Sequence, residues 1–305
     1  MTERNPNPQP KIGKAERLKA LLARDPGVLS CPVCGGALLF ARETSALRCA
    51  RGHSYDLAKK GYANLQGRGG DAKSVYSRAL FESRRAVFGF GFYEEAARAI
   101  TGIAKKHLRP SEAPIRSESA GAHRVLDAGC GEGYYAFMLS RDAQLRDACR
   151  FYGLDLSRDA VAMATDYDAD IAWIVADLAK PPFRDGAFDL ILNALSPAGY
   201  GAFRRILAPN GVLIKVLPGR DYLRELRALL GERGRGESEA AAHCAKHMRI
   251  AERANIRYRC ALQAEQKKAL PAMTPLTAGK NLDPSALDSL HCLTIDLEIV
   301  AGRPF

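Results

Sequence analysis

The stretch "RVLDAGCGEGYY", residues 124–135, decides the fold class. A short apolar run ends at Asp127, and three glycines follow at alternate positions before a segment with helical spacing: Gly129, Gly131 and Gly133. Glycines at this place let the backbone turn sharply and pass close to a ligand at the carboxyl end of a first parallel strand. A dinucleotide fingerprint carries its third glycine one residue later. The spacing therefore favours an adenosyl amino acid over a nicotinamide cofactor.

Downstream of this loop, short apolar runs alternate with segments of helical period as far as the C-terminal run "LTIDLEIV" (293–300). Such alternation is typical of right-handed crossovers and of a parallel sheet covered on both faces. Residues 124–305 are therefore predicted to form an α/β domain built on a mostly parallel sheet.

Two acidic residues end the next two apolar runs. Asp155 closes "FYGLD", where a carboxylate can accept hydrogen bonds from both ribose hydroxyls. Asp177 closes "IAWIVAD", where it and Leu178 can border an adenine ring. Three strand-end features in register predict S-adenosylmethionine. Within the loop and strand ends, the predicted cofactor-binding residues are Asp127, Gly129, Gly131, Glu132, Gly133, Asp155, Leu156, Asp177, Leu178 and Asn193.

At the fourth strand end, "FDLILNALSPA" (188–198) offers Asn193, Ser196 and Pro197 beside the expected position of the sulfonium methyl. Methyl transfer by direct displacement gains mostly from positioning of donor and acceptor. Asn193 is therefore predicted to position the target base, with an ordinary turn residue as the alternative.

Upstream, "CPVCGGALLFARETSALRCARGH" (31–53) holds three cysteines and a histidine. Two residues separate Cys31 from Cys34 and three separate Cys49 from His53, so each pair can clamp one ion. Three thiolates and one imidazole form a closed tetrahedral shell that suits a structural Zn²⁺. Basic residues surround the cluster and indicate either an RNA contact or a solvated face: Arg48, Arg51, Lys59 and Lys60.

The chain divides into five predicted regions. Residues 1–28 form a tail, disordered over 1–11, with a short helix within 12–24, and residues 29–70 form the zinc-binding module. A flexible joint at 67–73 leads into residues 71–108, a connecting helical region interrupted at Gly89 and Gly91. Residues 109–123 are a linker before the domain at 124–305.

Charge and hydropathy bear on partners and location. With 45 basic and 34 acidic side chains, the net charge of +11 favours a polyanionic partner. No apolar run approaches the length of a spanning helix, and the first residues lack a hydrophobic signal core. We therefore expect no membrane partner and a cytoplasmic location, where clustered cysteines indicate metal binding rather than disulfides.

Taken in order, the motifs resemble the RlmA family of 23S ribosomal RNA guanine-N1 methyltransferases. The resemblance rests on the cysteine cluster, the glycine loop and four further stretches: "GHSYDLAKKGYANL", "RRAVFGFGFYEEAARAI", "NALSPAGYGAFRRIL" and "MTPL". The "NALSPA" form is similar to the Gram-positive branch, whose relatives include a tylosin-resistance methyltransferase. The resemblance implies a Rossmann-like class I methyltransferase fold with a mostly parallel, seven-stranded sheet, methylation of a guanine in a hairpin loop of 23S rRNA, RNA recognition by the zinc module, and a homodimer. It leaves open whether antibiotic resistance follows.

The resemblance also assigns individual residues. Cys31, Cys34, Cys49 and His53 match the zinc ligands of the family. Tyr93, in "GFYEEA", matches a tyrosine that contacts the cofactor. Tyr222, in "LPGRDYLREL", stands where the family usually carries a histidine.

The proton on guanine N1 needs an acceptor, and the sequence singles out none; Glu132 is one candidate. Two alternatives stay open. The same domain could methylate a small molecule or a protein, with the zinc module as a brace. The chain could instead be a non-catalytic rRNA-binding assembly factor that retains a relic pocket.

Overall fold

The computed structural model describes residues 12–40, 44–66, 76–108, 122–232, 239–277, 280 and 284–305. The tail predicted for residues 1–11, the whole joint at 67–73 and most of the 109–123 linker lie outside these described residues.

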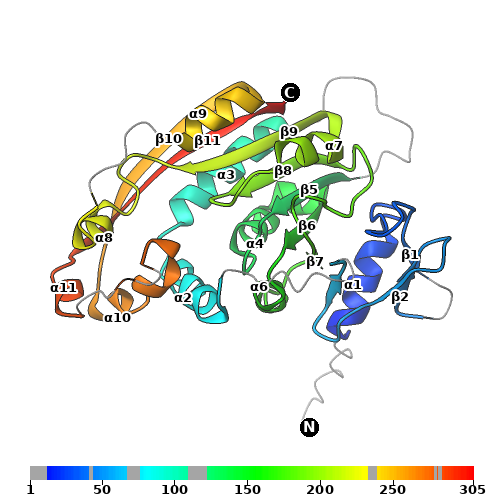
Figure 1. Ribbon diagram of the computed structural model, residues 1–305, viewed down its shortest axis with the longest axis horizontal. Coiled ribbons are helices and arrows are strands. Elements are labelled where there is room, and N and C mark those ends of the chain that lie inside the picture. Colours follow the sequence, from blue (N-terminus) through cyan, green and yellow to red (C-terminus); the bar gives the residue numbers. More distant parts are fainter. Residues whose placement is uncertain are drawn as a thin grey trace, which may run out of the picture.

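One large sheet organises the molecule. Its strands are β4 (Tyr62–Asn64), β5 (His123–Ala128), β6 (Cys149–Asp155), β7 (Ile171–Val175), β8 (Phe188–Ala194), β9 (Leu207–Pro218), β10 (Met248–Ala261) and β11 (Cys292–Pro304). The order across the sheet is β10-β11-β9-β8-β5-β6-β7-β4, with parallel pairing from β4 to β9 and antiparallel pairing of β11 with β9 and β10 (Figure 1). The predicted class I methyltransferase architecture is therefore confirmed.

The sheet has eight strands rather than the expected seven. The additional strand is β4, from the segment predicted to belong to the zinc module, and it pairs with β7 through Tyr62 and Trp173. The residues of β7, "IAWIV", are buried throughout, so an uncovered edge here would expose backbone donors and acceptors beside apolar side chains. The short β4 covers that edge and ties the N-terminal part of the chain to the sheet.

Helices cover both faces of the sheet. They are α1 (Lys14–Ala23), α2 (Arg78–Gly89), α3 (Glu94–His107), α4 (Tyr134–Arg141), α5 (Ala143–Ala148), α6 (Arg158–Ala164), α7 (Tyr200–Ile206), α8 (Arg224–Leu229), α9 (Glu239–His247), α10 (Ala264–Lys267) and α11 (Pro284–Asp288), with 3₁₀ turns η1 (Pro271–Met273) and η2 (Pro275–Thr277). Alternate strand residues enter opposite cores, as Val125 and Leu126 of β5 do. The core containing Val125 includes α3, α4 and α8, and the core containing Leu126 includes α1, α7 and α9.

Two helices, α2 and α3, precede β5 in the chain. Ser77 accepts a hydrogen bond from the Leu80 N–H and caps α2. Helix α2 ends at Gly89, and Gly91 adopts a positive φ of 80° in the turn before α3 begins. Helix α3 buries alanines and isoleucines at helical spacing, with acidic residues in its first turn and basic residues in its last. Among the described helices, none combines the length and apolar character needed to cross a bilayer.

The zinc module lies at one end of the molecule beside α1 (Figure 1). It contains a small antiparallel sheet of three strands: β1 (Leu39–Phe40), β2 (Ala46–Arg48) and β3 (Ser54–Asp56). Its apolar residues, among them Leu29 and Leu47, belong to the same core as Leu18 of α1 and Ile174 of β7. The module and the large sheet therefore share one apolar core.

Candidate cofactor cavity and zinc site

The glycine loop passes from β5 to α4 with a geometry that requires glycine. Gly129, Gly131 and Gly133 have φ values of 80°, 55° and 93°. The N–H groups of Gly129 and Cys130 both donate to the Leu154 carbonyl, at 2.8 and 3.0 Å, which holds the loop against the end of β6. A Cβ on Gly133 would lie 2.6 Å from the Trp173 ring. The turn is therefore closed to larger residues by both conformation and space.

Asp155, at the end of β6, faces this loop. One carboxylate oxygen accepts a hydrogen bond from the Gly131 N–H at 2.9 Å, and the other accepts from the Ser157 N–H at 2.8 Å. These bonds fix the direction of the carboxylate. Each oxygen has a further lone pair, so the group can still accept two ribose hydroxyls.

A cavity of about 940 Å³ opens over the loop and the strand ends. Its volume is at the upper end of the range for small-molecule sites. Most of the predicted cofactor residues line it: Tyr93, Gly129, Gly131, Glu132, Asp155, Leu156, Asp177, Leu178 and Tyr222. Three do not: Asp127, Gly133 and Asn193.

Asp127 has a different place from the one predicted. It is buried under the loop and accepts a hydrogen bond from the Ala136 N–H at 3.1 Å, so it anchors the first turn of α4. Burial, reinforced by the charges of Asp155 and Glu132, raises the pKa of Asp127 to about 7. Direct contact with the cofactor is therefore not supported for Asp127, which instead shapes the loop from below, as Gly133 does.

The position of Asn193 also differs from the one expected for a residue that contacts the target base. Its side chain is 0% exposed, and its amide donates to the Ala128 carbonyl at 2.6 Å and to the Pro197 carbonyl at 3.3 Å. Its carbonyl oxygen accepts a hydrogen bond from the Lys215 Nζ at 2.6 Å. All of its polar atoms are used inside the protein, so direct contact with a target base is not supported. The neighbouring Ala194, Leu195 and Ser196 line the cavity instead.

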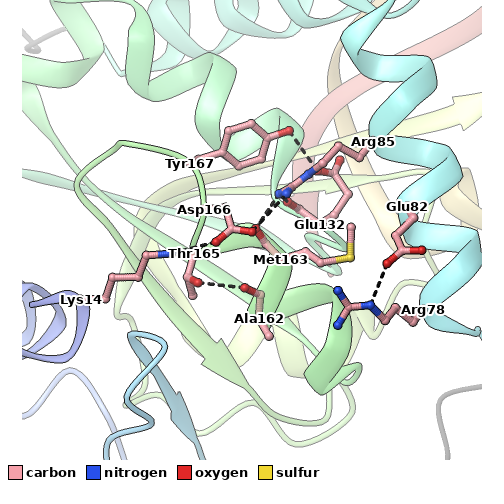
Figure 2. Close-up of polar contacts among 10 residues, drawn as sticks. All are labelled: Lys14, Arg78, Glu82, Arg85, Glu132, Ala162, Met163, Thr165, Asp166 and Tyr167. Atoms are coloured by element: carbon pink, nitrogen blue, oxygen red, sulfur yellow. Dashed lines mark hydrogen bonds and ion pairs between the residues drawn. The ribbon is translucent and has the colours of Figure 1, made fainter.

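Glu132 is tied to surrounding side chains. Figure 2 shows Arg85 of α2 directed toward Glu132, with Tyr167 beside it. Arg85 Nε lies 3.4 Å from a Glu132 carboxylate oxygen that also accepts a hydrogen bond from the Tyr167 hydroxyl at 3.0 Å. Arg85 further donates to the Met163 carbonyl at 2.5 Å. The carboxylate therefore links α2, the glycine loop and the end of α6.

An aromatic wall closes another side of the cavity. The hydroxyls of Tyr93 and Tyr222 lie 2.7 Å apart, so tyrosine at position 222 pairs with the predicted cofactor tyrosine. Phe88 stacks on Tyr134 with ring centroids 4.3 Å apart. The hydroxyls of Tyr134 and Tyr135 are buried and have no hydrogen-bond partner among the described residues. Their unused hydrogen-bonding capacity is consistent with a polar ligand in the cavity.

Several residues that line the cavity had no predicted role. Among them are the basic residues Arg84, Lys215 and Arg227 and the segment Met273–Leu276. Arg84 Nε donates to the Met273 carbonyl at 3.1 Å, which joins α2 to η1 across the cavity. The motifs "RRAVF" and "MTPL", which contain Arg84 and Met273–Leu276, belong to the family resemblance and could have indicated a functional role. Neither motif indicates by itself where its side chains point.

The electrostatics beneath the loop fit S-adenosylmethionine. Burial raises the pKa of Asp155, and burial also raises that of Glu132 despite the opposing Arg85 and Tyr167 contacts. Three carboxylates that lack full solvation therefore lie in or beside the loop: Asp127, Glu132 and Asp155. A ligand with a sulfonium and an ammonium group would stabilise their charged forms. The loop, the free lone pairs of Asp155 and the cavity volume agree with the predicted cofactor.

The four predicted metal ligands meet at one point. The ligand atoms of Cys31, Cys34, Cys49 and His53 all lie within 4.8 Å of one another. The His53 Nδ1 lies 3.5 and 3.3 Å from the sulfurs of Cys31 and Cys49, and the sulfurs of Cys34 and Cys49 are 3.6 Å apart. A tetrahedral zinc shell requires ligand separations of roughly 3.5 to 3.8 Å. The residues fit one structural zinc ion.

A neighbouring side chain supports this cluster. The Tyr55 hydroxyl lies 3.4 Å from the Cys31 sulfur. Burial opposes ionisation of Cys31, but this contact and backbone N–H bonds outweigh it and lower the pKa of the thiol to about 6. The thiolate is the form that binds zinc, and a hydrogen bond to a ligand orients it for the metal.

Two family models match the chain. A zinc-ribbon model described as RlmA, N-terminal, matches residues 29–66, and a methyltransferase-domain model matches residues 125–211. The matched segments contain the cysteine–histidine cluster and the strands and loop around the cavity, respectively.

Curated relatives span nearly the whole chain. YxjB of Bacillus subtilis, provisionally named a 23S rRNA (guanine-N(1)-)-methyltransferase, is 32% identical over 286 residues, 91% of this chain and 98% of that protein. The 23S rRNA (guanine(748)-N(1))-methyltransferase of Streptomyces fradiae is 29% identical over 90% of this chain and 96% of its own length. A provisionally named enzyme of Micromonospora griseorubida is 29% identical over 85% and 89%. Since the similarity includes both the zinc ribbon and the methyltransferase domain, the chain belongs to the RlmA family of 23S rRNA (guanine-N1-)-methyltransferases.

Proposed function

We propose that this chain transfers a methyl group from S-adenosylmethionine to N1 of a guanine in a hairpin loop of 23S rRNA. The observation that carries the proposal is the joint presence, in one chain, of a complete zinc-ribbon ligand set and a cavity bordered by the glycine loop and Asp155. When bound, S-adenosylmethionine supplies an electrophilic methyl group on a sulfonium centre.

Each part of the cavity has a task in this proposal. Asp155 accepts the ribose hydroxyls, and Leu156, Asp177 and Leu178 border the adenine. The Tyr93–Tyr222 pair contacts the amino-acid end. N1 of guanine is buried in a paired base, so the target nucleotide must leave its stack and enter the cavity. The apolar and aromatic walls provide a surface on which an unstacked base can lie.

Replacement of Asp155 by alanine is expected to weaken S-adenosylmethionine binding by about 10- to 100-fold, since two charge-assisted hydrogen bonds to the ribose are lost. Isothermal titration calorimetry measures the effect. Asp159→Ala is a suitable control, because this exposed residue in the first turn of α6 is not among the residues that line the cavity. Unchanged affinity in Asp155→Ala would remove the ribose assignment.

Recognition of RNA by the zinc module is part of the proposal. Arg48, Arg51, Lys59 and Lys60 of the zinc module are exposed, so they can reach phosphates. Neutralising Arg51, Lys59 and Lys60 together should lower RNA affinity and flatten its dependence on salt. If the enzyme methylated a small molecule or a protein instead, this triple variant would keep full activity and added rRNA would have no effect.

The deciding experiment is a comparison of rRNA from cells with and without the gene. Methylation at N1 blocks Watson–Crick pairing, so reverse transcription should stop at one guanine of 23S rRNA only when the protein is present. Mass spectrometry of the same fragment should show one added methyl group. A binding factor with a relic pocket would produce neither signal.

Three further expectations accompany this proposal. A homodimer is expected from the resemblance, and sedimentation of the full chain measures it. A cytoplasmic location is expected from the rRNA substrate, and fractionation measures it. A role in resistance would appear as increased tylosin sensitivity after deletion of the gene.

A further inference from the structure

The proposed reaction releases the proton of guanine N1, and the carboxylates near the loop are poorly placed to take it. Glu132 is held by Arg85 and Tyr167, and Asp155 is held by two backbone N–H groups. Asp127 lies below the loop and does not line the cavity. The acceptor must therefore be sought elsewhere on the cavity wall.

Lys215 of β9 is a buried amine on that wall. It is 5% exposed, lines the cavity and stands directly opposite Asn193 in the pairing of β8 with β9. Its Nζ donates to the Asn193 side-chain carbonyl at 2.6 Å and to the Ser196 backbone carbonyl at 2.5 Å. Both acceptors belong to the "NALSPA" segment, next to the residues that border the cavity at the fourth strand end.

These two bonds determine what the amine can do when it is neutral. A neutral amine has two N–H donors and one lone pair. With both donors bound to Asn193 and Ser196, the lone pair is the function that remains. Asn193 is itself fixed by its bonds to the Ala128 and Pro197 carbonyls, so the direction of the amine is set by buried structure.

We propose that the neutral amine of Lys215 accepts the N1 proton of the target guanine, an assignment that rests on the proposed function. The N1–H bond breaks and the proton moves to Nζ, which becomes an ammonium. The electron pair of N1 forms the bond to the methyl carbon, while the carbon–sulfur bond breaks and its pair stays on sulfur. The products are N1-methylguanine and S-adenosylhomocysteine, and the ammonium later releases its proton to solvent.

The surroundings of Lys215 favour this protonation state. Burial lowers the pKa of Lys215 to about 8, and the Cys244 thiol on α9 has a small opposing effect. Tyr200 of α7 and His243 of α9 line the same cavity as Lys215, and no described carboxylate pairs with the amine. The lowered pKa increases the share of enzyme that carries the neutral amine near neutral pH. A buried lysine of lowered pKa is suited to proton transfer near neutral pH.

The test is single-turnover methyl transfer by the full chain to a 23S rRNA transcript between pH 6 and 10. The wild-type rate should rise about tenfold per pH unit below pH 8 and then level off. Lys215→Met and Lys215→Arg should each lower the rate by roughly 100-fold or more, since neither side chain can take the proton. Calorimetry should show S-adenosylmethionine affinity within about threefold of wild type, which excludes misfolding as the cause.

Two measurements separate proton transfer from a structural role. In a transcript with 8-azaguanine at the methylated position, N1 is more acidic, so Lys215→Met should recover about tenfold or more of its loss. Asn193→Asp places a carboxylate against Nζ and should move the rising limb of the pH profile to higher pH. His243→Gln, as a control, should leave that limb in place.

The outcomes are distinct. Full activity in Lys215→Arg, or a loss in Lys215→Met that 8-azaguanine does not relieve, would overturn the assignment of Lys215 while leaving the methyltransferase function intact. A wild-type enzyme that methylates no guanine at N1 would overturn the proposed function itself.

Discussion

Replacement of Cys49 by serine is expected to abolish tight zinc binding and to destabilise the whole chain. Serine is not deprotonated at neutral pH and is a poor zinc ligand, so only three protein ligands remain. Structural zinc contributes about 10 to 16 kcal/mol to the folding of isolated zinc-finger peptides. Here the sulfur atoms of Cys31 and Cys49 also belong to the core shared with the large sheet. Loss of the ion should therefore also destabilise parts of the chain beyond β1, β2 and β3.

Two measurements test this prediction. Elemental analysis of purified wild-type protein should give about one zinc per chain, and Cys49→Ser should retain less than about a fifth of that. Thermal unfolding should shift downward by about 5 °C or more. Cys260→Ser is the matched control, because this half-buried cysteine of β10 lies outside the cluster and should leave zinc content unchanged. A zinc-free, fully stable Cys49→Ser protein would contradict a structural metal.

The features that sequence reasoning identified are local in the chain. The cysteine pairs are each closed by a few residues, and the glycine loop lies within one turn between a strand and a helix. Asp155 and Asp177 follow apolar runs, and the ends of parallel strands meet at one edge of a sheet. Spacing alone was therefore sufficient to place the metal ligands together and Asp155 beside the loop.

By contrast, the sequence did not predict the direction in which the side chains at the fourth strand end point. Successive residues of a strand point to opposite faces, so the role of Asn193 depends on the register of β8 against β9. The partner that occupies Asn193 is Lys215, 22 residues later, and the sequence contains no local signal that pairs them. Arg84 and Met273 meet across 189 residues, which likewise required the folded chain.

The buried ion cluster around Asp25 also joins residues that are far apart in the sequence. Asp25 follows α1, is 3% exposed and accepts hydrogen bonds from Arg124 at 2.7 Å and from Arg150 at 2.5 Å. Its second carboxylate oxygen accepts a hydrogen bond from the Tyr152 hydroxyl at 2.5 Å. Arg124 lies in β5, and Arg150 and Tyr152 lie in β6, so a single carboxylate attaches the N-terminal segment to two central strands.

Replacement of Asp25 by alanine is expected to lower the free energy of unfolding by about 3 to 5 kcal/mol. The variant leaves the Arg124 guanidinium and the buried Tyr152 phenol without this acceptor, and Arg150 keeps only the Arg24 carbonyl, so the desolvation of these groups is no longer fully compensated. Urea unfolding at pH 7 measures the change. Asp168→Ala serves as the control, because its bridge to Arg17 is solvent-exposed and should contribute little. A shift in Asp25→Ala no larger than that of the control would contradict the cluster's role.

The pH dependence of this difference follows from the direction of the Asp25 pKa. Burial opposes ionisation, but hydrogen bonds from Arg124 and Tyr152 and the charges of Arg124 and Arg150 outweigh it, so the folded-state pKa is lowered. The contribution is therefore complete above the unfolded-state pKa of about 3.9 and is lost as pH falls through the folded-state value. The stability gap between wild type and Asp25→Ala should stay constant from pH 7 to pH 5 and narrow only below about pH 4. A gap that closes already between pH 7 and pH 5 would mean that Asp25 is not held as a carboxylate by the two arginines.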